Sequence, residues 1–346
     1  MAYDIKTAED KILKACKLLV EKGLIARTWG NISARLSTDE FLVTPSGRSY
    51  DTLKAEELVR VRIKDHSYDG DIKPSSEKGM HAELYKLRKD CNFIIHTHQS
   101  NASALSVYGE DFILDEYSEK TVSDEDKKIL GPVIPCAKYG LSSTKRLTNN
   151  IARSAKANPE SCTVLMKHHG AVIIGKDDEE AFKACDVLEE VCGRIYEKKC
   201  GEKLYDDMVD WQGKETEEGY ELIARTPYIM EMCRRGKRVY AYLDDMAMIS
   251  GYTTECIKDR SDEKELQKAI EGRNAVLVKN VGAICFAPDK EEAEAVAIIL
   301  EKNCRAANLA LKKALSPVNK ISAAVERKVY VEKYSKLKNA GGQEDA

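Results

Sequence analysis

Residues 91–98, CNFIIHTH, form an apolar run of strand length that ends in two histidines, and we predict a buried strand here. Further along the chain, TVLMKHHGAVIIG at 163–175 predicts two strands joined by a tight turn at His169-Gly170. Residues 177–196 have acids at their start and apolar positions at helical spacing, which predicts an amphipathic helix. Four of the six histidines of the chain lie in these segments, and no histidine follows residue 169.

His96 and His98 are two residues apart on the predicted strand, so both imidazoles point to the same face. A third nitrogen would complete a three-histidine cradle with one coordination position open, as catalytic zinc requires. His169, at the hairpin turn, is the natural candidate. Taken alone, the pattern fits two satisfied core histidines at least as well, so the neighbouring motifs must decide between the two interpretations.

Small polar loops precede the strand. GNIS at 30–33 and TPSG at 44–47 would let backbone N–H groups approach an anion closely. Ser75 and Ser76 stand before a predicted helix over 77–89, and a helix N-terminus favours phosphate. Glu77 follows them. Its carboxylate could act as a general base beside a divalent cation, or it could be an acid favoured by the helix dipole.

A partial repeat occupies the second half of the chain. Residues 275–308 match 163–196 at a constant offset of 112, with 12 of 34 positions identical. This predicts an internal duplication, and the match extends back to 221–232. The second copy lacks the first 90 residues of the first copy. It also lacks the imidazoles, because the places of His96, His98 and His169 are taken by Ile223, Arg225 and Val281.

Composition narrows the class of protein. A length of 346 residues suggests two domains, and 55 basic against 58 acidic residues give a net charge of −3, which disfavours nucleic acid as a partner. No apolar run is long enough to span a bilayer, and the first residues do not resemble a signal peptide, so we expect no membrane partner and a cytoplasmic location. The 11 cysteines include no CxxC pair, so we expect reduced, buried thiols.

Six motifs occur in the order TWGNIS, FLVTPSG, KPSSE, HTH, GPVIPC and KHHG. In this order and spacing the sequence resembles the class II aldolase and adducin family, over roughly residues 6–200 and weakly over the repeat. The resemblance implies an α/β fold: a three-layer α/β/α domain around a mostly antiparallel central sheet, with a truncated repeat of the same fold. We therefore expect a catalytic domain at 1–200, a linker at 201–220, and a degenerate repeat with a C-terminal tail at 221–346.

The resemblance also implies roles for individual residues. It implies one divalent metal ion per chain, zinc as in the aldolases, and Glu77 as the catalytic acid/base. His66 and His81 match no motif, and we expect them to be surface or helix-packing residues. A tyrosine proton donor is expected in the family, but none aligns here without a gap. The metal ligands would be His96, His98 and His169, and the phosphate-binding residues Gly30, Asn31, Ser46, Gly47, Ser75 and Ser76.

The activity implied is that of a lyase, a class II aldolase that cleaves or forms a C–C bond of a sugar phosphate through an enediolate. Pentulose-phosphate 4-epimerases and a dehydratase of a thioether sugar phosphate are alternatives within the family, and the epimerases typically carry Asp at the position of Glu77. A non-catalytic, adducin-like interaction module is disfavoured because all three histidines are present. The family also implies a homo-oligomer. We expect a dimer, with the second copy in a structural role; the alternative is that it forms a second binding site whose ligand is not a metal.

Overall fold

The computed structural model describes residues 2–25, 29–201 and 209–334. The chain divides into two compact units, Met1–Ile195 and Tyr196–Ala346, which are described separately below. Within the described residues, no helix combines the length and the apolar character needed to cross a bilayer.

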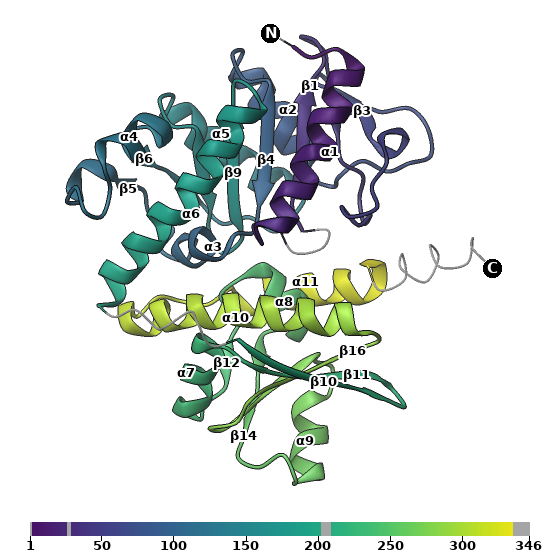
Figure 1. The fold of residues 1–346 in the computed structure, drawn as a ribbon, viewed down its shortest axis with the longest axis vertical. Helices are drawn as coiled ribbons and strands as arrows, with labels where there is room; N and C mark the ends of the chain where they lie inside the picture. Colours follow the sequence, from purple (N-terminus) through teal and green to yellow (C-terminus); the bar gives the residue numbers. More distant parts are fainter. Residues whose placement is uncertain (1, 26–28, 202–208, 335–346) are drawn as a thin grey trace. The chain divides into compact units, whose positions relative to one another are not determined.

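A seven-stranded sheet forms the centre of the first unit (Figure 1). All neighbouring strands are antiparallel except β7 and β8, which run parallel. The expected mostly antiparallel sheet is therefore confirmed. Its strands, in spatial order, are β3 (Val59–Arg62), β2 (Glu40–Val43), β1 (Asn31–Arg35), β4 (Phe93–Thr97), β9 (Gly170–Gly175), β8 (Thr163–Met166) and β7 (Cys136–Ala137).

Helices cover both faces of this sheet, which confirms the three-layer α/β/α arrangement. On one face, α2 (Lys78–Leu87) and α5 (Lys145–Ala157) bury Leu84, Tyr85 and Ile151 against strand residues such as Ile94 and Val172. On the other face lie α1 (Ile5–Glu21), α3 (Ser100–Ser106) and the start of α6 (Asp178–Cys200) (Figure 1). The helix α4 (Asp124–Leu130) and a two-stranded ribbon of β5 (Phe112–Ile113) and β6 (Val133–Ile134) complete the unit.

The described residues of the second unit contain a five-stranded sheet, the five α-helices α7 to α11 and a π-helical turn at Tyr330–Tyr334. The strand order is β10 (Asp210–Thr216), β11 (Gly219–Arg225), β16 (Gly282–Ala287), β15 (Ala275–Val278) and β14 (Cys256–Ile257). A ribbon of β12 (Val239–Tyr240) and β13 (Thr253–Thr254) lies outside this sheet. The helices are α7 (Pro227–Arg235), α8 (Asp244–Ser250), α9 (Glu263–Ile270), α10 (Lys290–Lys313) and α11 (Lys320–Val329).

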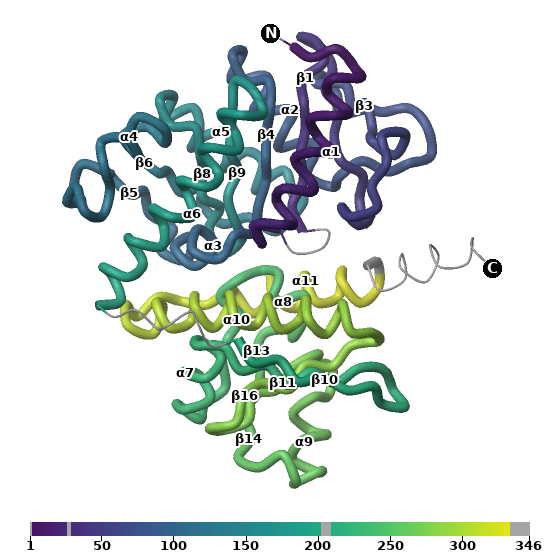
Figure 2. Tube along the Cα trace, viewed as in Figure 1, coloured from purple at the N-terminus to yellow at the C-terminus, as the bar shows by residue number. Residues whose placement is uncertain are grey.

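The second unit repeats the first from β4 to α6, element by element, as β11 to α10 (Figure 2). In each copy the edge strand runs parallel to its neighbour, β7 to β8 in the first and β14 to β15 in the second. Each copy also has a separate two-stranded ribbon, β5–β6 in the first and β12–β13 in the second. The hairpin turns also agree, because His168 and Asn280, 112 residues apart, have φ of 64° and 60°. His96 lies opposite Val172, and Ile223 lies opposite Ile284, which fixes the alignment of the first strands.

A half-buried carboxylate is kept in both copies. Glu189 on α6 accepts backbone hydrogen bonds from Asn101 and Ala102 at the start of α3. Glu301 on α10 does the same for Tyr228 and Ile229 at the start of α7. Each carboxylate satisfies N–H groups that the first turn of a helix leaves without an intrahelical partner. The duplication therefore preserved a polar packing contact as well as the apolar core.

The expected linker at 201–220 needs correction. Residues 202–208 lie outside the described range, but β10 already begins at Asp210 and pairs with β11 over seven residues. Beside β11, β10 occupies the place that β1 occupies beside β4. Its sequence, DWQGKET, has little apolar alternation and is mostly exposed, so main-chain pairing across a tight hairpin forms this strand without a hydrophobic pattern.

Candidate active site

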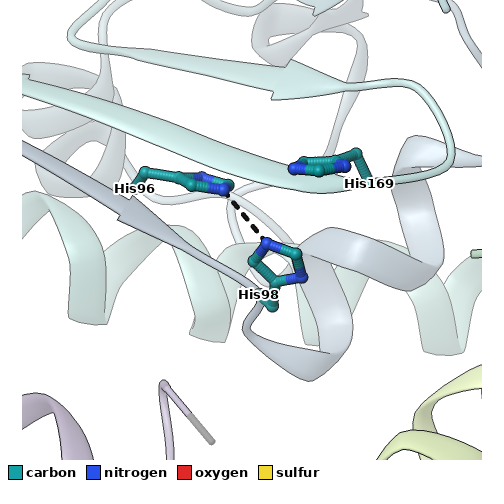
Figure 3. Close-up of side chains that lie close together, drawn as sticks. All are labelled: His96, His98 and His169. Carbon is teal, nitrogen blue, oxygen red and sulfur yellow. Dashed lines mark hydrogen bonds between the residues drawn. The ribbon is translucent and has the colours of Figure 1, made fainter. Parts of the chain in front are cut away.

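The structure brings the three predicted histidines together (Figure 3). His96 and His98 project from the end of β4, and His169 from the turn between β8 and β9. One ring nitrogen from each lies within 4.8 Å of the others, and the Nε2 atoms of His96 and His98 are 3.0 Å apart. His96 and His169 are buried and His98 is half-buried. In the part of the chain that the structure describes, this is the group whose side chains could hold a metal ion.

Three structural features aim these rings. The Nδ1–H of His96 donates to the backbone carbonyl of Ala171 at 2.8 Å, so the Nε2 lone pair faces the other histidines. Gly170 lets the hairpin approach β4, because a Cβ there would lie 2.3 Å from the Thr97 carbonyl oxygen. Ser142 adds a hydroxyl 3.3 Å from Nδ1 of His169. The donor set, three imidazoles of which His96 and His169 have oriented outer nitrogens, fits a zinc-type ion.

Glu77 lies at the start of α2, with its carboxylate directed at the histidines. Its Oε2 is 3.2 Å from Nε2 of His96, and its Oε1 is 3.4 Å from Nε2 of His169. Burial alone would raise the pKa of this carboxyl group, but His96 and His169 hold it well below its ordinary value. Glu77 is therefore an ionised carboxylate next to the ring nitrogens, at the residue where α2 begins, and its role as acid/base stays a prediction.

A chain of buried hydrogen bonds ends on this carboxylate. The Asn31 amide donates to Glu77 Oε2 at 3.0 Å, and Nε2–H of His81 donates to the Asn31 carbonyl oxygen. Behind them, the Ser33 hydroxyl lies 2.6 Å from His81 Nδ1 and 2.8 Å from the Tyr85 hydroxyl. Because a carboxylate can only accept, the donors must run from Tyr85 through Ser33, His81 and Asn31 to Glu77.

This chain requires neutral His81, and burial lowers the pKa of His81 from 6.5 to about 3. The interpretation of His81 as a surface or helix-packing residue is therefore incomplete. Its ring is fully buried within the network that holds Asn31 and Glu77. A signal was present in the sequence, because His81 follows Glu77 by four residues, one turn along the same helix face. Ser33 and Tyr85 carried no comparable signal.

The predicted phosphate loops lie side by side. Ser46 N–H donates to the Lys73 carbonyl at 2.9 Å, and Ser75 N–H donates to the Thr44 carbonyl at 3.0 Å. The Ser75 hydroxyl accepts from the backbone N–H of Glu77 at 3.2 Å, so this loop leads directly into the catalytic candidate. Gly47 has a positive φ of 76° in the first of these loops. A third segment, missed from the sequence, joins them, because Ser143 donates to the Ser76 hydroxyl at 2.7 Å.

Gly30 and Asn31 occupy a different part of the site from these loops. Gly30 has a φ of 120°, and a Cβ on it would lie 2.5 Å from the His96 carbonyl oxygen, so glycine permits β1 to begin against β4. Asn31 is 4% exposed, and the contacts described for its amide are with Glu77 and His81. These contacts make Asn31 a partner of the carboxylate, whereas its assignment to the phosphate group stays a prediction.

The equivalent place in the second unit has no histidine. Arg225, in the position of His98, forms an ion pair with Asp210 at 2.7 Å, and its Nε donates to the Val281 carbonyl at 2.9 Å. An arginine neutralised in this way ties β10 to the hairpin turn. The polar group that replaces the second histidine therefore stabilises the sheet edge.

Comparison with known proteins agrees with this geometry. The family described as "Class II Aldolase and Adducin N-terminal domain" matches residues 10–196 and 224–308. The chain belongs to this family. Its second match falls within the second unit, as expected for a partial second copy of the domain.

Curated relatives differ in the reaction that their names record. A 5-methylthioribulose-1-phosphate/5-deoxyribulose-1-phosphate aldolase of Escherichia coli is 35% identical over 48% of this chain and 72% of its own length. A methylthioribulose-1-phosphate dehydratase of Yersinia enterocolitica is 30% identical over 51% and 86%. An L-fuculose phosphate aldolase of Haemophilus influenzae is 30% identical over 52% and 77%. A solved L-fuculose 1-phosphate aldolase has 28% identity and a TM-score of 0.48, covering 55% of this chain and 84% of its own.

Proposed function

We propose that this class II aldolase family member is a metal-dependent lyase that cleaves and forms a C–C bond of a sugar phosphate. One observation carries the proposal. The Glu77 carboxylate lies 3.2 and 3.4 Å from ring nitrogens of His96 and His169, in the group completed by His98. A base beside a three-histidine cation site is what removal of a carbon-bound proton next to a carbonyl requires.

His96, His98 and His169 would hold the ion, for which we propose zinc, because three imidazoles leave one position open in a tetrahedral site. When bound, the ion supplies Lewis-acid charge next to the substrate oxygens, which favours the enediolate form of the substrate. The outer nitrogens of His96 and His169 meet Ala171 and Ser142, so the rings are already oriented for this role.

Glu77 moves the proton at the reacting carbon. Its Oε2 accepts from Asn31, which limits rotation of the carboxylate and directs its remaining lone pairs toward the histidines. The site is largely buried, so a bound substrate would exclude water from the carboxylate. Ser46, Gly47, Ser75 and Ser76 offer hydroxyl and backbone donors for the phosphate group, and this far end of the substrate would orient the reacting carbon.

Dehydration of a thioether sugar phosphate is the second candidate, because an aldolase and a dehydratase with closely related substrates are both among the relatives. Both reactions need the same cation site and a base next to the carbonyl. They differ in the bond that breaks and in the order of the steps. In aldol cleavage the C–C bond breaks first and Glu77 then returns a proton to the carbon, whereas in dehydration Glu77 removes the carbon-bound proton before the C–O bond breaks. The aldolase breaks a C–C bond and releases an aldehyde, whereas the dehydratase breaks a C–O bond and retains the whole carbon chain.

The decisive experiment presents the zinc-loaded full chain with 5-deoxyribulose 1-phosphate, methylthioribulose 1-phosphate and fuculose 1-phosphate in separate reactions. Products are followed by NMR and mass spectrometry, with Glu77→Gln as the matched control. We expect dihydroxyacetone phosphate and an aldehyde from at least one substrate. A product lighter by one water, with no aldehyde, assigns the dehydratase activity instead. Turnover of none of the three ketose 1-phosphates contradicts both.

A further inference from the structure

The second unit contains a hollow of about 450 Å³ outside the repeated metal position. It lies where α8 ends, between the β12–β13 ribbon and the turn that precedes β15. Its lining includes the cations Arg238, Arg273 and Lys320 and the rings of Tyr240 and Tyr252. The volume is that of a small-molecule site.

The same place in the first unit is closed. Gly131 ends α4 there, and a Cβ on it would lie 2.5 Å from the Glu160 carbonyl oxygen. Gly251 ends α8 in the equivalent position, also with positive φ, yet a Cβ on it would meet no atom within 4 Å. In the first copy the turn at Glu160 packs against Gly131, whereas no atom packs as closely against Gly251 in the second copy.

Arg327 of α11 accounts for the separation. In the first copy, Cys162 N–H donates directly to the carbonyl of Leu130, the last residue of α4. In the second copy, the Arg327 guanidinium lies between the corresponding segments. It donates to the Met248 and Ile249 carbonyls on one side and to the Gly272 carbonyl on the other. α11 has no counterpart in the repeat, so the opening is a feature of the second unit alone.

The residues that changed around this opening became more polar. Ser250 replaces a fully buried leucine of the first copy and is itself 2% exposed, and its hydroxyl has no hydrogen-bond partner among the described residues. An unpartnered buried hydroxyl is costly unless a ligand or water satisfies it. In alignment order, Leu130, Pro132, Val133 and Ser161 of the first copy correspond to Ser250, Tyr252, Thr253 and Arg273.

The charges of the hollow favour an anion. Arg273 is held in place by its Nε–H donating to the Thr253 carbonyl at 2.8 Å. Glu271 lines the hollow, and Glu255 lies 3.4 Å from Arg238 and 3.7 Å from Arg273, so three cations exceed two carboxylates by one charge. Among the described residues no ion pair involves Lys320, which leaves its ammonium group for a ligand.

From these observations we infer that the second unit binds a small phosphate monoester in this hollow. Arg238 and Lys320 would meet the phosphate oxygens, and Arg273, which is held by carbonyls of Thr253, Ala269 and Glu271, would add its charge from a fixed position. Ser250 would donate its hydroxyl, and the rings of Tyr240 and Tyr252, inclined to each other by 61°, would form an apolar wall for the organic part. The second copy thus lost the metal position and gained a binding position elsewhere. The inference does not depend on the reaction proposed for the first unit.

The test is isothermal titration of the full chain with ribose 5-phosphate and with inorganic phosphate. Lys320→Gln removes a cation from the hollow, and Lys264→Gln, on the exposed side of α9 and outside the lining, is the control with the same change in charge. Ser250→Leu restores the first-copy residue, because Leu130 is fully buried at the equivalent position there. Thermal unfolding of each variant checks that it folds.

We expect the number of ribose 5-phosphate molecules bound per chain to fall by one in Ser250→Leu, and the affinity of that site to weaken tenfold or more in Lys320→Gln. Lys264→Gln should match wild type. Equal stoichiometry and affinity in all four proteins would overturn the inference. So would the absence of binding of either phosphate probe at this site of the wild-type protein.

Discussion

Replacing His81 by Gln tests the buried network through its pH dependence. Burial lowers the pKa of His81 from 6.5 to about 3 in the folded protein, so between these values the unfolded chain binds a proton that the folded chain does not. Stability from this group is therefore fully present above pH 6.5 and is lost as the pH falls. A pH of 5 is about 1.5 units below the pKa of His81 in the unfolded chain. At about 1.36 kcal/mol per unit, the free energy of unfolding therefore falls by about 2 kcal/mol.

Urea unfolding at pH 7.5 and pH 5 measures this loss. The chain has two tryptophans, Trp29 and Trp211, so in a Trp211→Phe background the fluorescence of Trp29 reports on the first unit. Wild type in that background should lose about 2 kcal/mol more between the two pH values than His81→Gln does. Glutamine can still accept from Ser33 and donate to Asn31, but it does not titrate.

His66→Gln is the control, because His66 is half-buried and lies outside the network. It should keep most of the wild-type pH dependence. His81→Gln should also be less stable than wild type at pH 7.5, by about 1–3 kcal/mol, since its hydrogen-bond geometry is poorer. Parallel pH dependences for wild type and His81→Gln would refute the assignment of a neutral, donating imidazole at this position.

Four further predictions concern the site and the assembly. Elemental analysis should find about one divalent ion per chain in wild type and little in His98→Ala; two tightly bound ions would contradict a site confined to the first unit. Glu77→Gln should lower turnover by about 10² or more while metal content stays near wild type, and an unchanged turnover would place the base elsewhere. Ser76→Ala should raise KM about tenfold or more through loss of a charge-assisted hydrogen bond. Asn31→Ala should also lower kcat, because it releases the Glu77 carboxylate. If Asn31→Ala changed KM alone, Asn31 would be assigned to the phosphate-binding residues. Light scattering should give about twice the chain mass of 38.7 kDa, and a monomer at micromolar concentration would disprove the expected dimer.

The sequence alone determined where the main strands and helices lie and which residue types could form the site. The apolar run before His96 and His98 predicted β4, and the 112-residue repeat predicted a second hairpin and helix, because periodicity and identity are local properties of the chain. The family motifs supplied the fold class and named Glu77 and the three histidines as a group. These predictions rest on residues that are few, chemically distinctive and fixed in order.

Tertiary structure decided which groups touch. Asn31 was assigned to phosphate from its loop, yet its amide meets Glu77, 46 residues away, because β1 pairs with β4 and α2 covers that face of the sheet. Strand β10 was expected as linker, since main-chain pairing needs no hydrophobic pattern. The opening beside Gly251 depends on Arg327 reaching α8 from α11, 78 residues along the chain. Sequence records which groups are present, whereas packing decides the partner of each buried polar group, because that partner must come from whichever segment the fold brings within hydrogen-bond distance.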